Sequence, residues 1–333
     1  MGAQLSGKRG YILWRNAAHR KNLGKGNGRR NRPSRYMRLV QFQGNHRDAR
    51  LGAIAGDRVI DLAAAARNAG QEDTLLQSTL SLLNGGDPAL ALARKLAQES
   101  SSGAPSLPLS SVRLLAPIAR PTKIVAIGLN YRDHCAELGI DPPKVPVIFA
   151  KFPNSITGPY DPIVLPGADI QGDYEAELAV VIGRNAKRTS ARDAMDCVAG
   201  YLVLNDVSAR KWQFADQQWV RGKSCDTFCP IGPWLTTKDE VPDPHDLHIA
   251  ARVNGQTRQD SNTSNLIFGV PELIEFITES ITLEPGDIID TGTPFGVGFS
   301  RKPPIFLQPG DVVEIEIERL GTLKNPVSRP TAR

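Results

Sequence analysis

Short apolar runs, each about as long as a strand, dominate the sequence from residue 37 onward. Residues 312–318 alternate apolar and acidic side chains, which is typical of a strand with one exposed face. Residues 177–182 are almost continuously apolar and rich in β-branched side chains, which predicts a buried strand. The same reasoning predicts further strands at 124–128, 147–150, 199–207, 247–253 and 288–290.

A smaller unit of mixed character precedes that region and covers residues 37–116. Serine and proline between residues 100 and 111 indicate a linker close to its end. Its predicted elements are strands at 38–42, 51–55 and 59–62 and helices at 80–83 and 89–98.

Helices are few in the remaining sequence. They are predicted at 131–138, 191–194 and 271–279, the last with proline in its first turn. The predicted fold is therefore mostly β with short helices. We expect a sandwich or barrel-like roll at 117–330, joined to a small α+β N-terminal domain.

The composition is that of an ordinary globular protein, with 41% hydrophobic and 23% charged residues. No run of about 18 apolar residues is present, so no transmembrane helix is predicted. Four cysteines among 333 residues do not suggest a disulfide framework, and a reducing cytoplasm is the expected location.

The net charge of +5 comes from the first 36 residues. They contain ten Lys and Arg residues and no acidic residue, whereas the remaining chain has 30 basic and 35 acidic residues. This basic extension has too few apolar residues to fold alone, so we predict that it is disordered. Three interpretations stay open: an extension outside the functional part, which would begin at Met37; a mitochondrial targeting segment; or an arm that binds nucleic-acid phosphates.

Two acidic residues precede the most apolar predicted strand. Glu175 and Glu177 are two positions apart, so on a strand their side chains would point to the same face. Like charges so placed are costly to bury unless a cation or a proton compensates them, and a divalent cation is the simplest solution. The alternative is an edge strand with a solvated acidic face.

A histidine and a glutamate are three positions apart on the helix predicted at 131–138. His134 and Glu137 would share one face of that helix. A carboxylate beside an imidazole orients it and raises its basicity, which is typical of a general base. An exposed helix with an incidental pair is the alternative.

A third acid lies at the end of another predicted strand. Asp206 could present an oxygen ligand to Mg²⁺ or Mn²⁺, or it could only accept backbone hydrogen bonds in a turn. Arg210 and Gln213 follow it. An arginine near a cation site is better suited to grip a substrate carboxylate than to bind the metal.

Two glycine-containing segments complete the set of polar candidates. Lys223 stands among glycines and prolines at 220–233, which indicates a shaped loop with its ammonium group aimed inward or, alternatively, a solvated loop charge. Residues 290–298 offer backbone N–H groups and hydroxyls that could hold an anion, or they form a plain turn between strands. The latter segment has no Gly-Lys-Ser/Thr sequence, so it is not a nucleotide-binding P-loop.

These segments, taken in order, resemble the fumarylacetoacetate hydrolase family. Five motifs carry the resemblance across residues 120–327: Gly-Leu-Asn-Tyr-x-x-His-x-x-Glu, Asp-Tyr-Glu-x-Glu-Leu, Asn-Asp-x-Ser-Ala-Arg, Gly-Lys-Ser-x-Asp and Thr-Gly-Thr-Pro-x-Gly-Val-Gly. Residues 37–116 resemble the small N-terminal domain that many members carry. Residues 1–36 match nothing in the family.

The resemblance implies a mixed β-sandwich roll, usually a homodimer, that acts on 2-oxo or 2,4-dioxo acids in catabolism. It implies that Glu175, Glu177 and Asp206 hold Mg²⁺ or Mn²⁺. Some relatives use a fourth carboxylate upstream of the histidine, and residues 124–128 offer none. The remaining site residues that the resemblance implies are His134 and Glu137 for water activation, Lys223 for enolate stabilisation, and Arg210, Gln213 and Thr293 for substrate binding.

The favoured function at this point is metal-dependent hydrolysis of a C–C bond in an acylpyruvate-type 2,4-dioxo acid. A second possibility on the same fold is an isomerase or decarboxylase of a 2-hydroxy-dienedioate, or a lyase of ureidoglycolate type. A third, from a different class, is a nucleic-acid-binding protein that uses the basic extension. The acidic balance of the remaining chain makes nucleic acid an unfavoured partner, and no membrane partner is expected.

Overall fold

The computed structural model describes residues 37–330 apart from 45–47, 72–73, 100–104 and 168. The predicted basic extension 1–36 and part of the predicted linker lie outside these residues. The N-terminal region contains five strands: β1 (Arg38–Gln43), β2 (Arg50–Ala55), β3 (Arg58–Asp61), β4 (Ser106–Pro108) and β5 (Arg113–Leu115).

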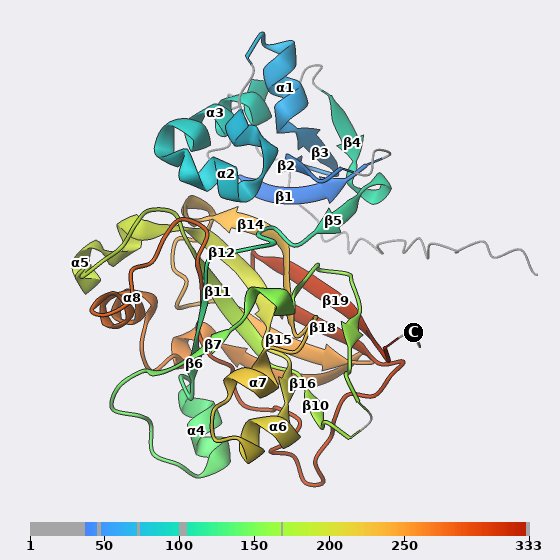
Figure 1. Cartoon of the computed structure of the whole chain (residues 1–333), viewed down its shortest axis with the longest axis vertical. Coiled ribbons are helices and arrows are strands. Elements are labelled where there is room, and N and C mark those ends of the chain that lie inside the picture. The colour runs from blue at the N-terminus through green and yellow to red at the C-terminus, as the bar shows by residue number, and fades with distance from the viewer. Residues whose placement is uncertain (1–36, 45–47, 72–73, 100–104, 168, 331–333) are drawn as a thin grey trace, which may run out of the picture. The chain divides into compact units, whose positions relative to one another are not determined.

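Three helices pack against the N-terminal strands (Figure 1). Helices α2 (Thr79–Asn84) and α3 (Gly86–Glu99) lie where helices were predicted. Helix α1 (Leu62–Asn68) was not predicted, although Asp61 caps it by accepting a 2.9 Å hydrogen bond from the backbone N–H of Ala64. Its run of alanines carries no amphipathic period, which explains why the pattern did not reveal it.

The linker predicted at 100–111 is wrong for its second half. Strand β4 pairs with β3 there, at the outer edge of the sheet. Proline is tolerated at a sheet edge, where its missing N–H costs no ladder hydrogen bond. The serine and proline content of this stretch therefore reflects an edge strand rather than a free connection.

One large sheet runs from this region into the remaining structure. Its central strands are buried on both faces, as the apolar sequence of β11 predicted. At Gly200 the neighbouring strands approach so closely that a Cβ atom would lie 2.1 Å from the carbonyl oxygen of Thr236. The order is β4-β3-β2-β1-β14-β12-β11-β17-β6-β7, with β14 (Cys229–Thr237), β12 (Val198–Asn205), β11 (Ala176–Ile182), β17 (Ile288–Asp290), β6 (Ile124–Gly128) and β7 (Val147–Lys151).

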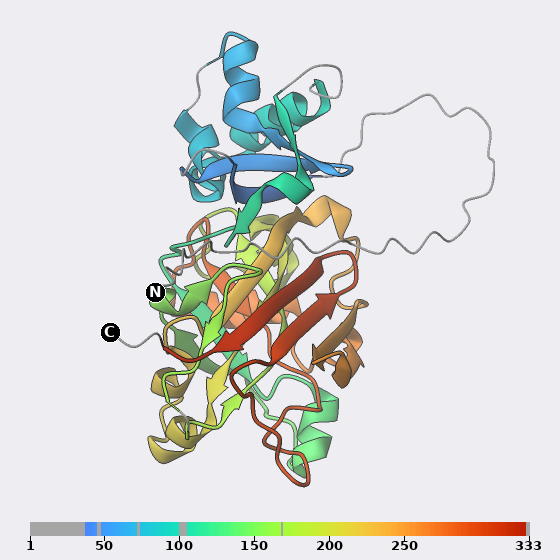
Figure 2. The ribbon, with the colours of Figure 1, turned by 90° about the vertical axis from the view of Figure 1, so that its right-hand side faces the viewer.

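A second sheet packs against this one and encloses the main hydrophobic core. Strands β18 (Val312–Ile317) and β19 (Gly321–Ser328) form an antiparallel pair in it, seen in red in Figure 2. Strands β16 (Gln256–Asn262) and β19 were not predicted, because β16 has a polar sequence and β19 contains a proline. The sheet order is β16-β15-β18-β19-β9, with β16 (Gln256–Asn262), β15 (His248–Val253) and β9 (Ile163–Val164).

Short elements surround the ends of the central strands. The segment predicted as one loop at 220–233 instead forms a helical turn followed by the start of β14. A two-stranded sheet joins β10 (Gly172–Asp173) to β13 (Ser208–Ala209), and β8 (Ile156–Thr157) pairs with β14. The helices are α4 (Arg132–Leu138), α5 (Ala191–Ala194), α6 (Arg210–Ala215), α7 (Val220–Lys223) and α8 (Val270–Thr278).

The predicted fold class, mostly β with short helices and an N-terminal α+β region, is confirmed. Among the residues that the structure describes, no helix has both the length and the apolar character needed to cross a membrane.

Candidate metal centre

Three acidic side chains converge where β11 and β12 meet. Glu175 immediately precedes β11, Glu177 lies on it, and Asp206 follows the end of β12. The pairing of Ala176 with Asn205 brings the two strand ends together. One carboxylate oxygen from each acid lies within 4.8 Å of those of the other two, and all three residues are buried. Two ligands of one cation at about 2.1 Å lie at most about 4.2 Å apart, so the observed separations are close to those of a shared cation.

Lys223 bridges two of these acids. Its Nζ atom lies 2.6 Å from Oε2 of Glu175 and 2.6 Å from Oδ2 of Asp206. The side chain is buried at the end of α7, and its ammonium group lies 5.2 Å from the centroid of the Phe149 ring. The inward orientation predicted for Lys223 is therefore present, and the solvated alternative does not apply.

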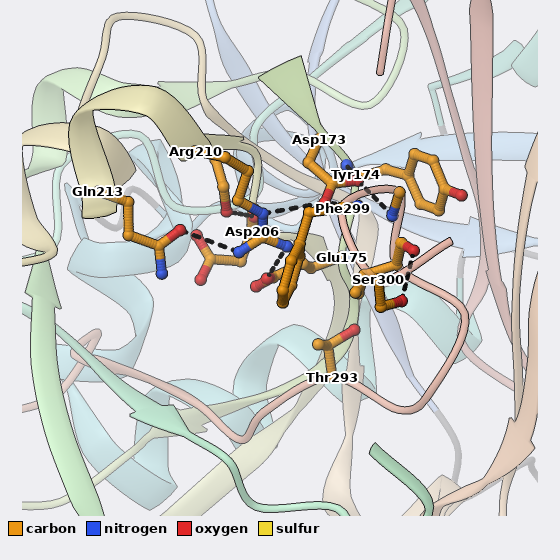
Figure 3. A network of polar contacts seen from close by, with 12 residues as sticks. Asp173, Tyr174, Glu175, Asp206, Arg210, Gln213, Thr293, Phe299 and Ser300 are labelled. Atoms are coloured by element: carbon orange, nitrogen blue, oxygen red, sulfur yellow. Dashed lines mark hydrogen bonds and ion pairs between the residues drawn. The ribbon is translucent and has the colours of Figure 1, made fainter. Parts of the chain in front are cut away.

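Arg210 organises the opposite side of Glu175 (Figure 3). Its guanidinium donates to Oδ2 of Asp173 at 2.9 Å, to Oε1 of Gln213 at 2.9 Å and to Oε1 of Glu175 at 2.5 Å. The ring of Phe299 covers it at 4.4 Å. Arg210 thus already has two carboxylate partners. Its guanidinium group therefore fixes these acids and is not free to bind a substrate carboxylate.

The ion pairs decide the charge of Glu175. Burial by itself raises the pKa of a carboxyl group, but the charges of Lys223 and Arg210 outweigh burial here and lower the pKa of Glu175 to about 2. Burial lowers the pKa of Lys223, and Asp206 and Glu175 more than reverse this effect, so its pKa is raised. Glu175 is therefore ionised and Lys223 is charged at neutral pH.

Glu177 lies in a different environment. Burial and the neighbouring carboxyl group of Asp290 raise its pKa well above the usual range. The backbone N–H of Gly292 donates to its Oε2 atom at 2.5 Å. No basic side chain forms an ion pair with Glu177 within the described part of the chain.

A second buried lysine supports the centre from behind. Nζ of Lys151 lies 2.6 Å from Oδ1 of Asp206 and also donates to the carbonyl oxygen of Lys223. The side chain is 0% exposed. Lys151 therefore fixes Asp206 from one side while Lys223 holds it from the other.

These buried groups form one cluster with an unequal charge. We call it the acid–base cluster; it contains five acids and three bases, all at most 5% exposed. If all eight are ionised, two negative charges remain, and burying them uncompensated would be costly. A divalent cation bound by the triad would neutralise the cluster, so these residues fit Mg²⁺ or Mn²⁺ in both geometry and charge. The members are Asp173, Glu175, Glu177, Asp206, Asp290, Lys151, Arg210 and Lys223.

The predicted histidine–glutamate pair is present on α4. Nδ1 of His134 lies 2.9 Å from Oε2 of Glu137; the His134 side chain is buried, and that of Glu137 is 19% exposed. Oε1 of Glu137 accepts hydrogen bonds from the N–H of Gly296 at 2.9 Å and from the hydroxyl of Ser300 at 2.7 Å. Burial raises the pKa of Glu137, but these hydrogen bonds and His134 lower it overall. The imidazole is thereby fixed with its Nε2 atom left for other contacts.

A cavity of about 260 Å³ lies between the acidic triad and the His134–Glu137 pair. His134, Glu175 and Lys223 line one part of it, and Phe149 and Trp219 form an aromatic wall. Gly128 makes room for this wall, since a Cβ atom there would lie 2.4 Å from the Trp219 ring. The other predicted site residues that line the cavity are Glu177, Arg210, Gln213 and Thr293.

Two of the nine predicted site residues do not line the cavity. Asp206 is fully buried behind it, held by the two lysines, and Glu137 contacts His134 from the far side. The hydroxyl of Thr293 lines the cavity but already donates to the carbonyl of Ala176 and accepts from the amide of Gln259.

Sequence reasoning missed three members of the cluster. Lys151 follows the apolar strand predicted at 147–150, and Asp290 ends the one predicted at 288–290; each is a charged residue at the end of an apolar run. Asp173 begins the motif that contains Glu175 and Glu177. It accepts hydrogen bonds from the N–H groups of Tyr174, Gly298 and Phe299 in addition to Arg210.

Comparisons with known proteins identify the family of the chain. Residues 123–328 match the family described as fumarylacetoacetate (FAA) hydrolase C-terminal. The protein named oxaloacetate tautomerase FAHD2A, mitochondrial, of Bos taurus is 49% identical over 300 residues, covering 89% of this chain and 93% of that protein.

Two solved structures show the same fold with lower sequence identity. A fumarylacetoacetate hydrolase from the psychrophilic Exiguobacterium antarcticum is 36% identical with a TM-score of 0.75 and covers 88% of this chain and 100% of its own. A maleylpyruvate hydrolase from Sphingobium sp. SYK-6, solved with manganese(II) and pyruvate, is 32% identical with a TM-score of 0.72; the match covers 89% and 100% of the two chains.

Proposed function

The chain belongs to the fumarylacetoacetate hydrolase family, and from this premise we propose that it is a divalent-metal-dependent tautomerase of a 2-oxo acid, with oxaloacetate as its substrate. The similarity to a mammalian protein named as an oxaloacetate tautomerase supports the reaction. The observation that carries the proposal is the acid–base cluster, whose triad and excess of two acids over bases suit a divalent cation beside a cavity lined by a histidine.

Glu175, Glu177 and Asp206 would hold the metal. A bound divalent cation acts as a Lewis acid that polarises the 2-oxo group and so acidifies the adjacent C–H bond. Each carboxylate oxygen accepts more than one partner, so the ion pairs of Glu175 and Asp206 with Lys223 do not exhaust their capacity to bind a cation.

Gln213 and Lys223 orient the substrate, and Arg210 positions Gln213. Gln213 accepts a hydrogen bond from Arg210 through Oε1, which directs its amide NH₂ group toward a substrate carboxylate in the cavity. Lys223 supplies positive charge where the enolate oxygen develops. Because its hydroxyl already has two partners, Thr293 serves mainly to shape the cavity wall.

His134 moves the proton. Its Nδ1–H donates to Glu137, which leaves Nε2 with a lone pair facing the cavity that His134 lines. In the keto-to-enol direction Nε2 takes the proton from C3. The electrons of the broken C3–H bond form the C2=C3 double bond, and the carbonyl π electrons move to the C2 oxygen. The imidazolium then returns its proton to that oxygen, and the reverse sequence gives the keto form.

Hydrolysis of a C–C bond in a 2,4-dioxo acid, the function favoured by the sequence, is the second candidate. The similarity to a maleylpyruvate hydrolase supports it, because the same His134–Glu137 pair could take a proton from water instead of from C3. Both reactions pass through the enolate of a 2-oxo acid, so the metal ligands do not distinguish them.

The decisive experiment follows the loss of enol absorbance of oxaloacetate with the purified protein in Mg²⁺-containing and chelator-treated buffers. We expect acceleration above the metal-catalysed background only with protein and Mg²⁺ together, and loss of acceleration in H134A. The matched control is H248A, since His248 is exposed, pairs with Asp260 on the neighbouring strand β16 and does not line the cavity. Acceleration that survives chelation, or an unaffected H134A variant, would contradict the proposal. A parallel panel of acylpyruvates tests the hydrolase candidate by pyruvate release.

The metal ligands are tested separately by titration calorimetry. E175Q, E177Q and D206N should each abolish or greatly weaken Mg²⁺ binding, because each removes one anionic ligand from a set of three. E99Q changes an exposed glutamate on α3 and serves as the control.

The same comparison supports a proposal for the location in the cell. The Bos taurus relative is named as mitochondrial, and residues 1–36 are rich in Arg and Lys and free of acids, as targeting segments are. We therefore favour mitochondrial targeting over the cytoplasmic location expected first. Attaching residues 1–36 to a fluorescent protein, with a version in which the arginines are replaced by glutamine as control, tests this.

A further inference from the structure

Asp290 is an acidic residue in the middle of the large sheet. It ends β17, whose other two residues are isoleucines, and it is 0% exposed. It pairs with Ala179 on β11, two residues from Glu177, and with Ala126 on β6. Because residues i and i+2 of a strand share a face, Asp290 and Glu177 point to the same side of the sheet.

The carboxyl group of Asp290 has an unusual environment for a buried acid. Among the residues that the structure describes, no N–H or hydroxyl group donates a hydrogen bond to either of its oxygens. It lies within hydrogen-bonding reach of the Glu177 carboxyl group, and the ammonium groups of Lys151 and Lys223 act on it from a greater distance. A buried acid without donors costs stability, so its presence calls for a function.

Asp287 shows the contrast on the same segment. It is also fully buried, but it accepts hydrogen bonds from the hydroxyl of Thr122, from the backbone N–H groups of Lys123 and Glu284, and from the Lys123 ammonium group. Asp287 is thus a structural acid that ties together a turn. Asp290 has no such partners, and its neighbour is a metal-ligand candidate.

We propose that Asp290 is a positioning residue of the metal centre, which orients Glu177 and supplies the negative charge that matches the acid–base cluster to a divalent cation. This inference rests on the proposed function, because it requires the triad to bind the metal. Without Asp290 the cluster has four acids and three bases, and a divalent cation would leave it positively charged. With Asp290 the sum with the cation is zero.

The position of Asp290 also bears on the lack of an acidic residue in β6. Residues 124–128 of β6 offer no acid near the triad, and the acidic side chain comes instead from β17, the strand hydrogen-bonded to β6. The carboxylate reaches the cluster from behind Glu177, since Asp290 does not line the cavity whereas Glu177 does. It therefore acts through Glu177 and not on the substrate.

The test compares D290N and D290L with wild type in the full-length, chelator-stripped protein. Titration calorimetry with MgCl₂ and MnCl₂ should show at least about tenfold weaker binding for both variants, as is usual when an outer-sphere partner is removed. The melting temperature of metal-free D290L should rise above that of wild type, because an acid without donors is replaced by an apolar side chain of similar size. Weaker metal binding together with a more stable apoprotein is a signature that a merely structural residue does not give.

D287N is the matched control. It should lower the melting temperature and leave metal affinity unchanged, since Asp287 has hydrogen-bond donors and is not part of the acid–base cluster. Unchanged metal affinity in both Asp290 variants, or a lower apoprotein melting temperature in both, would overturn the inference. If wild type itself binds neither cation, the proposed function fails first. Should D290L not fold, the affinity of D290N alone decides.

Discussion

Replacing Lys151 by methionine tests whether the acid–base cluster is held together by charge. The side chain is fully buried, and its ammonium group contacts Asp206 at 2.6 Å without lining the cavity. Methionine is similar in length and apolar, so K151M removes the charge and the hydrogen bonds while it leaves little empty space.

The expected loss of stability follows from the burial of both partners. Removing one partner of a buried ion pair costs about 3–5 kcal/mol; here Asp206 loses one of its two ammonium partners and keeps the other, Lys223. For a chain of this size about 2 °C of melting temperature corresponds to 1 kcal/mol, so the metal-free variant should melt about 6–10 °C lower. The cluster would then have five acids and two bases. A divalent cation should therefore raise the melting temperature of K151M more than that of wild type.

The assay is thermal denaturation of wild type and K151M, each with chelator and with saturating MgCl₂. K95M is the matched control, since Lys95 is exposed and forms a 3.9 Å pair with Glu99 on the same helix. Such exposed pairs contribute about 0–1 kcal/mol, so K95M should melt within about 2 °C of wild type. The charge argument would be refuted if K151M had the same melting temperature as K95M. It would also be refuted if Mg²⁺ raised the melting temperature of K151M no more than that of wild type.

Three further predictions concern the cavity and its acids. H134A should bind Mg²⁺ like wild type in calorimetry but lose about 10²–10⁴-fold in kcat, because only the proton carrier is removed. G128A should raise KM in steady-state assays, since the new Cβ atom would displace the Trp219 ring that lines the cavity. The raised pKa values of Glu177 and Asp290, the latter about 7, mean that the folded apoprotein keeps protons there which the unfolded chain releases. The contribution of Asp290 to stability should be full below about pH 4 and be lost as the pH rises through about 7, so the melting-temperature advantage of D290L over wild type should grow across that range.

The parts of the site that sequence could predict are those where a charge interrupts a clear pattern at short range. Glu175 and Glu177 flank the start of an apolar strand, and His134 and Glu137 have helical spacing. In each case the relevant partner is within three residues, so local geometry alone defines the pair. Asp206 was predictable because strand ends gather ligands, and the pairing of β11 with β12 places it there.

The remaining contacts depend on sheet order, which a single sequence does not reveal. Lys151 reaches Asp206 across 55 positions and Lys223 reaches Glu175 across 48. The position of Asp290 beside Glu177 requires β17 to lie between β11 and β6, antiparallel to one and parallel to the other. Strand β14 was hidden for a related reason, because its prolines read as loop until pairing with β1 and β12 is known.

The hydrogen bonds of Glu137 bear on the choice between tautomerisation and hydrolysis. Hydrolysis needs a water molecule held in place while His134 takes one of its protons. A carboxylate next to the imidazole is the natural acceptor for the hydrogen bond from the second O–H of that water. Here Oε1 of Glu137 already receives two donors, Gly296 and Ser300, and Oε2 is occupied by the imidazole. Oε2 can accept one further hydrogen bond, as from water, and the aromatic wall of Phe149 and Trp219 adds no other acceptor. Direct proton transfer between His134 and the substrate needs no such water molecule, which agrees with the proposed tautomerisation.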